Sequence, residues 1–235
     1  MNKEEFIEEV NKLGLTLKEE QLNQLDQYYH LLIEENEKIN LTAISEEKQV
    51  YLKHFYDSLT LMKAVSLKEV ESLCDIGTGA GFPGLVLKIA FPSLTVTLVD
   101  ALNKRILFLN KVIEELGLEN ICAVHARMEE YAKVNRDVFD IVTARAVAPL
   151  KELVEYGVPA LKVGGRLIFM KGNLKEEELE NMERVMNTLK LEKMKKEVFL
   201  LPIENSTRTL ISFVKKEPTP NKYPRKYKEI KNYKW

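Results

Sequence analysis

The chain has 235 residues and a net charge of −1, with 45% hydrophobic and 30% charged residues, 10 glycines and 8 prolines. At roughly 100–200 residues per domain, this length predicts one good-sized domain with an appendage, or two small domains. The composition excludes collagen-like, low-complexity and wholly disordered chains. No apolar run approaches the roughly 18–20 residues that span a bilayer, and the acidic start MNKEEFIEEV is unlike a basic leader peptide. We therefore expect a cytoplasmic protein without a membrane partner.

The small net charge conceals two regions of opposite sign. Residues 1–70 contain 8 Lys and Arg against 14 Asp and Glu, whereas residues 215–235 contain 8 Lys and Arg against 2 Glu. The basic end also carries Tyr223, Tyr227, Tyr233 and Trp235. Cations interleaved with aromatic rings suit phosphate neutralisation and base stacking. Composition alone leaves two hypotheses open for this end, an RNA-binding tail and a solubilising extension.

The two cysteines, Cys74 and Cys122, each lie inside an apolar run typical of a strand, and neither has a CxxC partner. This pattern argues against a disulfide framework and against a zinc site. We expect both cysteines to be buried as small hydrophobic residues, and we expect no metal site.

Hydrophobic periodicity divides the chain into three parts. Apolar residues recur at three- and four-residue spacing from residue 3 to about 65, which predicts a small helical region. From about residue 70, short apolar runs alternate with amphipathic stretches, which is typical of a parallel sheet with crossover helices. The predicted parts are a helical region over 1–66, a main α/β domain over 67–216 and a basic aromatic tail over 217–235.

The main domain is predicted to be a Rossmann-like, doubly wound fold with seven strands. Helices are expected at 83–90, 104–116, 150–161 and 175–190, and strands at 71–76, 95–100, 121–124, 139–143, 166–171, 197–201 and 210–214. Only a short loop separates the last two strands, so we expect them to pair antiparallel at one edge of a mostly parallel sheet.

The most informative segment is a glycine-rich loop that follows the first predicted strand. Residues 75–84 read DIGTGAGFPG, and residues 79–84 match the dinucleotide-binding pattern GxGxxG. Glycines permit the tight turn and the close approach of a ligand to the backbone. Asp100 ends the next strand, 19 residues after Gly81, where a carboxylate can accept hydrogen bonds from ribose hydroxyls. Taken alone, these features predict a nicotinamide-dependent enzyme.

Two features favour S-adenosylmethionine over a dinucleotide. Asp75 lies two residues before Gly77, and its carboxylate would repel a pyrophosphate but could face the cationic methionine end of S-adenosylmethionine. The predicted antiparallel strand pair after five parallel strands is the variation of this fold used by S-adenosylmethionine-dependent methyltransferases. We therefore expect Gly77, Gly79, Gly81 and Asp75 to belong to a cofactor site.

Further polar residues follow the other strands, on the rim where open α/β sheets bind ligands. Each also has a purely structural interpretation, as a helix-turn residue, an ion-pair partner or a solvated strand end. Their shared position on one rim favours a ligand-binding site. The polar residues are Asp100, Arg127, Glu129, Arg145 and Lys171, and Met128 lies between Arg127 and Glu129.

An ordered set of motifs extends over nearly the whole chain. The motifs are NEKINLT at 36–42, HFYDSL at 54–59, DIGTGAGFPG at 75–84, LVD at 98–100, KR at 104–105, RMEE at 127–130, ARA at 144–146, MKG at 170–172 and YPRK at 223–226. In these motifs the chain resembles the bacterial family of 16S ribosomal RNA guanine-N7 methyltransferases called RsmG or GidB.

The resemblance implies methyl transfer from S-adenosylmethionine to N7 of one guanosine in a decoding-region loop of 16S ribosomal RNA. Matched by motif, Gly77 and Phe82 would contact the cofactor, Asp100 its ribose, and Met128 and Glu129 the adenine. The family usually has alanine where Met128 stands, which still permits a backbone contact. Arg145 would lie at the reactive end of the cofactor or beside the incoming base.

The chemistry of such a reaction agrees with what the sequence contains. Guanine N7 has an unprotonated lone pair at neutral pH, so its methylation needs no general base. Neither a DPPY tetrapeptide nor a well-placed nucleophilic cysteine is visible. Catalysis would then rest on alignment and exclusion of water, with Arg145 and Lys171 as the predicted active-site residues.

The sequence also predicts a binding partner and leaves two alternative functions open. The expected substrate is 16S ribosomal RNA or the small ribosomal subunit, and the expected oligomeric state is a monomer. The predicted RNA-binding residues are Lys53, His54, Lys104, Arg105, Arg225 and Lys226. Two other functions remain open from the sequence, a nicotinamide-dependent oxidoreductase and a non-catalytic ribosome-binding module.

Overall fold

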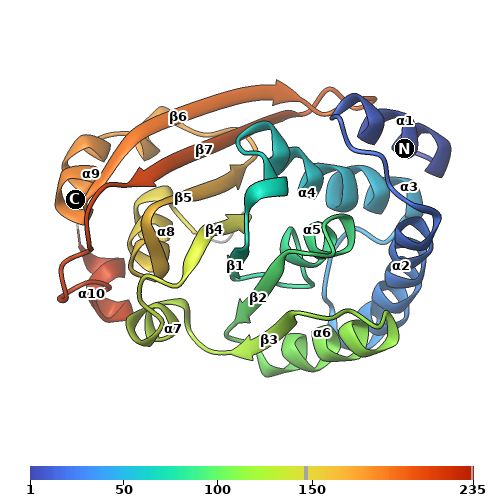
Figure 1. Ribbon diagram of the computed structural model, residues 1–235, viewed down its shortest axis with the longest axis horizontal. Helices are drawn as coiled ribbons and strands as arrows, with labels where there is room; N and C mark the ends of the chain where they lie inside the picture. Colours follow the sequence, from blue (N-terminus) through green and yellow to red (C-terminus); the bar gives the residue numbers. More distant parts are fainter. Residues whose placement is uncertain (146–147, 234) are drawn as a thin grey trace.

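A seven-stranded sheet runs through the molecule and separates two layers of helices (Figure 1). The structure is a computed structural model that describes residues 1–145, 148–233 and 235. The strands are β1 (Ser72–Ile76), β2 (Thr95–Asp100), β3 (Ile121–His125), β4 (Phe139–Arg145), β5 (Leu161–Lys171), β6 (Leu191–Leu200) and β7 (Thr207–Lys215). Their order across the sheet is β3-β2-β1-β4-β5-β7-β6.

The α-helices are α1 (Lys3–Lys12), α2 (Glu19–Ile39), α3 (Glu47–Val50), α4 (Asp57–Leu59), α5 (Gly84–Ala90), α6 (Asn103–Glu115), α7 (Met128–Val134), α8 (Leu150–Gly157), α9 (Met182–Leu189) and α10 (Tyr227–Asn232). A π-helical segment, Tyr51–Tyr56, joins α3 to α4, and 3-10 turns lie at Thr60–Lys63, Leu67–Glu69, Val158–Ala160 and Glu176–Glu178. Among the described residues, no helix combines the length and the apolar character needed to cross a membrane.

The pairing of the strands confirms the predicted fold class. Strands β1 to β5 are parallel to one another, whereas β7 pairs antiparallel with both β5 and β6. The last two strands therefore form the predicted antiparallel pair at one edge of the sheet. Because the parallel strands share one direction, their carboxyl ends meet on one rim, where a ligand site is expected.

Several element boundaries differ from the prediction. The predicted helix over 150–161 ends at Gly157, because a 3-10 turn that contains Pro159 follows at Val158–Ala160 and Leu161 already pairs with Phe139 in the sheet. The predicted helix over 175–190 is interrupted at Asn181, whose backbone is left-handed with φ 56°. Strand β6 starts six residues earlier than predicted, because a bulge between Glu192 and Lys195 lets its charged first half pair with β7.

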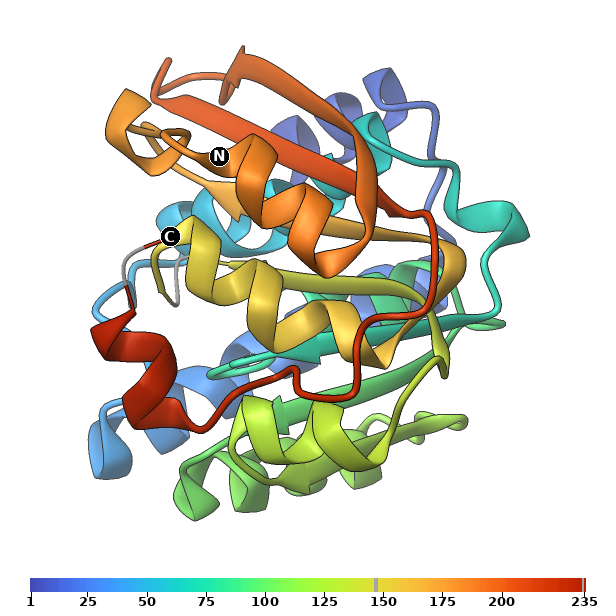
Figure 2. The same ribbon diagram turned by 90° about the vertical axis from the view of Figure 1, so that its left-hand side faces the viewer.

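Each face of the sheet has its own apolar cluster. One cluster combines the N-terminal helices with α5 and α6, and the other combines α7, α8 and α9 with the C-terminal segment (Figure 2). Tyr28 on α2 is fully buried against the rings of Phe55, Phe82 and Phe108. The side-chain amide of Gln21 donates to the carbonyls at the end of α5, at 2.7 and 3.0 Å. Helix α2 is thus packed along α5, from Phe82 in the glycine loop to the last residues of α5.

The cysteine prediction was correct for one residue only. Cys74 in the central strand β1 is fully buried, and burial raises the pKa of its thiol. Cys122 is exposed, because β3 is an edge strand in which no residue is fully buried. Among the described residues, no group of three or more His, Cys, Asp or Glu side chains is arranged to hold a metal ion.

Candidate active site

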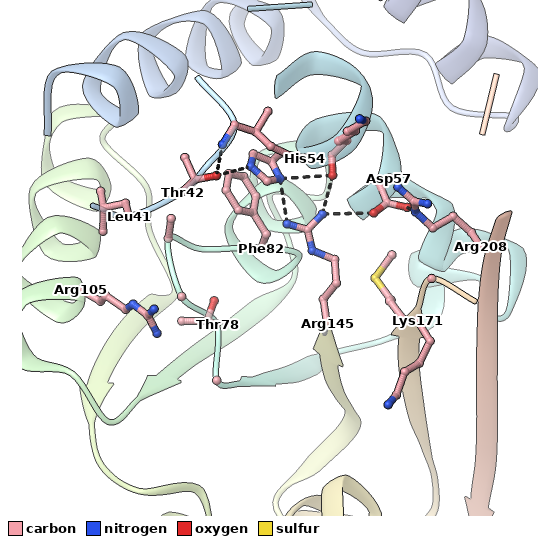
Figure 3. A pocket seen from close by; sticks show the side chains of 17 residues that line it. Leu41, Thr42, His54, Asp57, Thr78, Phe82, Arg105, Arg145, Lys171 and Arg208 are labelled. Atoms are coloured by element: carbon pink, nitrogen blue, oxygen red, sulfur yellow. Dashed lines mark hydrogen bonds and ion pairs between the residues drawn. The ribbon is translucent and has the colours of Figure 1, made fainter. Parts of the chain in front are cut away.

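A cavity of about 640 Å³ lies at the carboxyl ends of β1, β4 and β5 (Figure 3). The N-terminal region forms one wall, through Leu41, Thr42 and His54, and the glycine loop forms another. The remaining wall comes from Arg145 at the end of β4, from residues 170–172 at the end of β5 and from Arg208 on β7. Segments that are far apart in the sequence therefore meet at the rim that the sequence indicated.

The glycines of the loop serve two different purposes. Gly77 and Gly79 have positive φ values of 69° and 63° and line the cavity. A Cβ atom added at Gly79 would meet nothing within 4 Å, so the backbone there is open to a ligand. Gly81, with φ 107°, lies on the other side of the loop, where a Cβ atom would come within 2.7 Å of the Tyr28 hydroxyl. Gly81 thus permits packing against α2 and is not part of the cavity lining.

Asp75 holds the loop from behind. Its Oδ2 atom accepts hydrogen bonds from the Thr78 hydroxyl at 2.7 Å and from the Gly84 amide at 2.8 Å. Its Oδ1 atom is buried and has no hydrogen-bond donor among the described residues. Burial raises the pKa of this carboxyl to about 6. Asp75 itself is fully buried and does not line the cavity.

Asp100 connects the end of β2 to the glycine loop. One carboxylate oxygen accepts from the Gly79 amide at 2.9 Å, and the other accepts from the Leu102 amide at 2.9 Å. The Arg105 guanidinium lies 3.1 Å from this carboxylate and lines the cavity, while its Nε atom is buried without a partner among the described residues. Asp100 is only 3% exposed. Its carboxylate therefore has a fixed position beneath the edge of the loop, and it does not itself line this cavity.

Arg145 is bound on three sides by the N-terminal region (Figure 3). Its Nη1 atom donates to the Lys53 carbonyl at 2.7 Å and to the Asp57 carboxylate at 3.2 Å, and its Nη2 atom lies 3.0 Å from Nδ1 of His54. Nδ1 also lies 3.2 Å from the Lys53 carbonyl, but arginine only donates, so the shorter contact with Arg145 requires Nδ1 to accept. The imidazole proton is then on Nε2, which lies 2.9 Å from the Thr42 hydroxyl. Burial, reinforced by the Arg145 charge, lowers the pKa of His54 to about 3. The imidazole is therefore neutral at physiological pH.

Phe82 forms the floor beneath this network. Its ring stacks on the His54 imidazole with centroids 4.4 Å apart and an interplanar angle of 17°. The Arg145 guanidinium lies 5.1 Å from the same ring. Phe82 is only 6% exposed, so it provides an apolar surface that keeps water away from one side of the cavity.

Two functional candidates, Asp57 and Arg208, escaped the sequence analysis. The two Asp57 carboxylate oxygens pair with different arginines, one with Arg145 at 3.2 Å and the other with Arg208 at 3.0 Å. The Asp57 side chain is 7% exposed, and the two arginine side chains are 15% and 19% exposed. Asp57 lies in the HFYDSL motif and could have been noted there. Arg208 follows a loop with no distinctive pattern, and only the pairing of β7 with β5 brings it to the cavity.

The electrostatic character of the cavity is positive. Among the described lining residues, one carboxylate, Asp57, faces five cations, which are Lys53, Arg105, Arg145, Lys171 and Arg208. Three carboxylates just outside the lining pair with these cations, Glu204 with Lys53 at 2.9 Å, Glu178 with Lys171 at 2.6 Å and Asp100 with Arg105 at 3.1 Å. With these partners counted, the cations exceed the carboxylates by one. Lys104 lies outside the cavity and donates to the Ile39 carbonyl at 2.9 Å. Such a concentration of cations suits a polyanionic ligand.

The sequence as a whole matches a known family. The family model GidB, described as rRNA small subunit methyltransferase G, matches residues 21–207. The chain belongs to this family. Two proteins named ribosomal RNA small subunit methyltransferase G are 47% and 48% identical to it, from Lysinibacillus sphaericus (strain C3-41) and Bacillus subtilis (strain 168). Each alignment covers 96% of this chain, and 96% and 95% of the respective relatives.

Solved structures agree on the fold of this GidB-family chain. A predicted O-methyltransferase from Agrobacterium tumefaciens has a TM-score of 0.56 and 16% identity, and the match covers 68% of this chain and 81% of that one. TYW2 from M. jannaschii, solved in complex with AdoMet, has a TM-score of 0.51 and 16% identity, with 62% and 68% coverage. The fold is therefore the class I methyltransferase variant of the Rossmann-like architecture.

The predicted adenine contacts of this GidB-family protein lie in a different cavity. Glu129 is 7% exposed, accepts from Nε of Arg127 at 2.8 Å and lines a second cavity of about 600 Å³ between α7 and the C-terminal segment. Met128, at the start of α7, is half-buried against the apolar cluster of that face. Arg225 and Lys226, predicted to bind RNA, line this second cavity rather than the first. Ala146 of the ARA motif and Lys234 of the tail lie outside the described residues.

Proposed function

We propose that this chain transfers a methyl group from S-adenosylmethionine to N7 of a specific guanosine in a decoding-region loop of 16S ribosomal RNA. One observation carries the proposal: in a chain of the GidB family, an open glycine-loop backbone and a ring of cations line the same cavity. The first feature suits a nucleoside cofactor, and the second suits a phosphate-rich substrate.

The residues at the loop fit S-adenosylmethionine. The open face at Gly79 leaves room for the cofactor against the backbone, and the Asp100 carboxylate at the loop edge can accept hydrogen bonds from ribose hydroxyls. Asp75 is fully buried behind the loop and does not line the cavity, so its contribution is to hold the loop against which the methionine end of the cofactor would lie. A dinucleotide would instead bring a pyrophosphate toward this carboxylate, which is unfavourable.

The mechanism requires alignment rather than proton transfer. S-adenosylmethionine supplies a methyl group bonded to a positively charged sulfur. Guanine N7 is an unprotonated acceptor, so no residue needs to remove a proton before the attack. His54 is not available as a base, because its two ring nitrogens are hydrogen-bonded to Arg145 and Thr42 and the imidazole is neutral. We assign His54 the role of fixing Arg145, not that of a general base.

Arg145 is the residue best placed to orient the base. Three of its hydrogen bonds fix the guanidinium to the N-terminal region, and a guanidinium carries five N–H donors. The donors that remain can reach guanine O6 or a neighbouring phosphate. The ring of Phe82 limits the access of water beneath this position.

The other cations of the cavity would neutralise the RNA backbone. Lys53, Lys171 and Arg208 each carry a partner carboxylate, so the pocket keeps its cations ordered before RNA arrives. Lys104 and Arg105 extend the positive surface along α6. RNA binding should therefore weaken steeply with salt, as it does when phosphate contacts displace counterions.

Titration calorimetry with the intact protein tests the class of the cofactor. The proposal predicts that S-adenosylhomocysteine binds and that NADH does not. Binding of NADH alone would support an oxidoreductase. Binding of neither ligand, by a protein that still binds small ribosomal subunits, would support a non-catalytic ribosome-binding module.

A further inference from the structure

The C-terminal segment is folded against the main domain and encloses the second cavity. One wall of this cavity comes from Arg127, Glu129 and Lys133 around α7, and the other comes from residues 224–229. Figure 2 shows α10 on the face of the sheet that carries α7 and α8, near the carboxyl ends of the central strands. The cavity thus lies next to the rim that holds the glycine loop.

A buried ion pair anchors this segment. Glu155 on α8 is fully buried, and its carboxylate accepts three hydrogen bonds from Arg225, from the backbone amide at 2.9 Å and from Nε and Nη2 at 2.9 and 2.5 Å. The guanidinium also lies 3.8 Å from the Tyr233 ring centroid and 4.9 Å from that of Trp235. Ile230 of α10 is 2% exposed. A segment held in this way has a fixed position and cannot act as a free arm.

Part of the positive charge of the basic end is committed to ion pairs within the protein. Lys215 is fully buried and pairs with Asp137 at 2.7 Å, and Lys231 pairs with Glu152 at 2.7 Å. Together with Arg225, three of its eight cations therefore serve the protein itself. The composition of the tail overstated the charge available to RNA.

A short chain of contacts leads from the C-terminal segment to the predicted adenine region. The Tyr227 ring lies 4.2 Å from the Arg127 guanidinium, whose Nε atom donates to Glu129 at 2.8 Å. Strands β2 and β3 are paired so that Asp100 lies opposite His125, and the Ala126 amide donates to the Asp100 carbonyl at 3.1 Å. A nucleoside with its ribose at Asp100 would therefore direct its base along the rim toward the residues that follow β3.

We propose that the C-terminal segment, through Tyr227 and the residues beside it, forms the outer wall of the pocket for the adenosine end of S-adenosylmethionine. This inference rests on the proposed function. The aromatic ring and the guanidinium of Arg127 present flat, polarisable surfaces to a purine, and Glu129 can accept from its exocyclic amino group. The same cations could instead contact RNA phosphates, and the experiment below separates these two roles.

The experiment measures S-adenosylhomocysteine binding by calorimetry with full-length protein in the absence of RNA. Tyr227→Ala should weaken binding about tenfold, which corresponds to about 1.4 kcal/mol. Tyr227→Phe keeps the ring and should bind like the unaltered protein. Lys216→Ala is the control, because Lys216 is an exposed cation of the same region that does not line the cavity. The Tyr227 side chain is largely at the surface, with 41% of the residue exposed, so these substitutions should not disturb folding.

The only tryptophan of the chain provides a second measurement. Trp235 stacks on Tyr223 with ring centroids 6.3 Å apart, so quenching of its fluorescence by acrylamide reports whether the segment is docked. The inference predicts that S-adenosylhomocysteine protects Trp235 from acrylamide and that Arg225→Gln abolishes this protection and weakens binding. Arg225→Gln should act by releasing the segment from Glu155.

Two results would overturn the inference and leave the proposed function standing. The first is unchanged S-adenosylhomocysteine affinity in Tyr227→Ala, and if the salt dependence of RNA binding is also reduced in that variant, Tyr227 and its neighbours would be assigned to RNA. The second is tighter binding of S-adenosylhomocysteine in Tyr227→Ala, which would mean that the segment blocks the cofactor pocket. Failure of the unaltered protein to bind S-adenosylhomocysteine would instead contradict the proposed function itself.

Discussion

The Asp57 carboxylate between two arginines gives the sharpest prediction about the architecture of the site. Asp57→Asn keeps the size of the side chain but removes the charge that faces Arg145 at 3.2 Å and Arg208 at 3.0 Å. At an effective dielectric constant of about 20, one such pair with its charges roughly 4 Å apart is worth ~4 kcal/mol before desolvation is counted. Since all three side chains are at most one-fifth exposed, solvent screens these pairs only partly. We expect a net loss of about 2–4 kcal/mol in the free energy of unfolding.

Urea denaturation of the unaltered protein and of Asp57→Asn measures this loss, and in a chain of this size the melting temperature should fall by roughly 5–10 °C. Glu34→Gln is the matched control, because it removes a carboxylate from a pair with Lys38 in which both side chains are more than half exposed. This control should leave the urea midpoint unchanged within error. An Asp57→Asn midpoint equal to that of the control would refute the claim that Asp57 fixes the two arginines.

Three further predictions concern the cofactor, the base and pH. Asp100→Ala should weaken S-adenosylhomocysteine binding by about 1–3 kcal/mol in calorimetry while circular dichroism shows an intact fold, and unchanged affinity would remove Asp100 from the site. Arg145→Ala should lower the rate on RNA far more than cofactor affinity, and an equal loss in both would reassign Arg145 to the cofactor. Burial holds the pKa of His54 in the folded protein at about 3, whereas an unfolded histidine has a pKa of about 6.5. Below pH 6.5 the unfolded chain gains a proton that the folded protein does not bind, so the free energy of unfolding decreases as the pH falls. Between pH 7.5 and 5.5, the unaltered protein should lose ~1.4 kcal/mol more stability than His54→Gln, as urea titrations at the two pH values would show, and equal losses would contradict a neutral buried imidazole.

The secondary structure was predictable where the residues of an element by themselves favour the conformation that they adopt in the fold. Strand β2 occupies the predicted residues Thr95–Asp100, because its short run of valine, leucine and threonine favours a strand, and all of its residues after Thr95 are buried. Strand β6 was predicted at half its length, because its first residues are charged and exposed and are held as a strand only by β7. Cys122 was misassigned because periodicity cannot distinguish a central strand from an edge strand.

The site residues were predictable where a functional motif directly follows its strand in the sequence. The glycine loop and Asp100 are contiguous with their strands, and the structure brings them together through the hydrogen bond from the Gly79 amide. The Arg208 contact depends on the pairing of β7 with β5 and the position of Asp57, and no local sequence pattern contains that information. The role of Arg225 was similarly hidden, because its partner Glu155 is 70 residues away in the chain.

Methyl transfer to isolated small ribosomal subunits tests the central claim most directly. The subunits would come from cells that lack this protein and would be incubated with it and labelled S-adenosylmethionine, and N7-methylguanosine would be located by borohydride and aniline cleavage of the RNA. The account predicts label at a single guanosine of a decoding-region loop in 16S ribosomal RNA, with chain cleavage at that nucleotide and strong loss of label in Arg145→Ala. Label on another atom or another RNA, or no label from a protein that binds S-adenosylhomocysteine, would contradict the assignment.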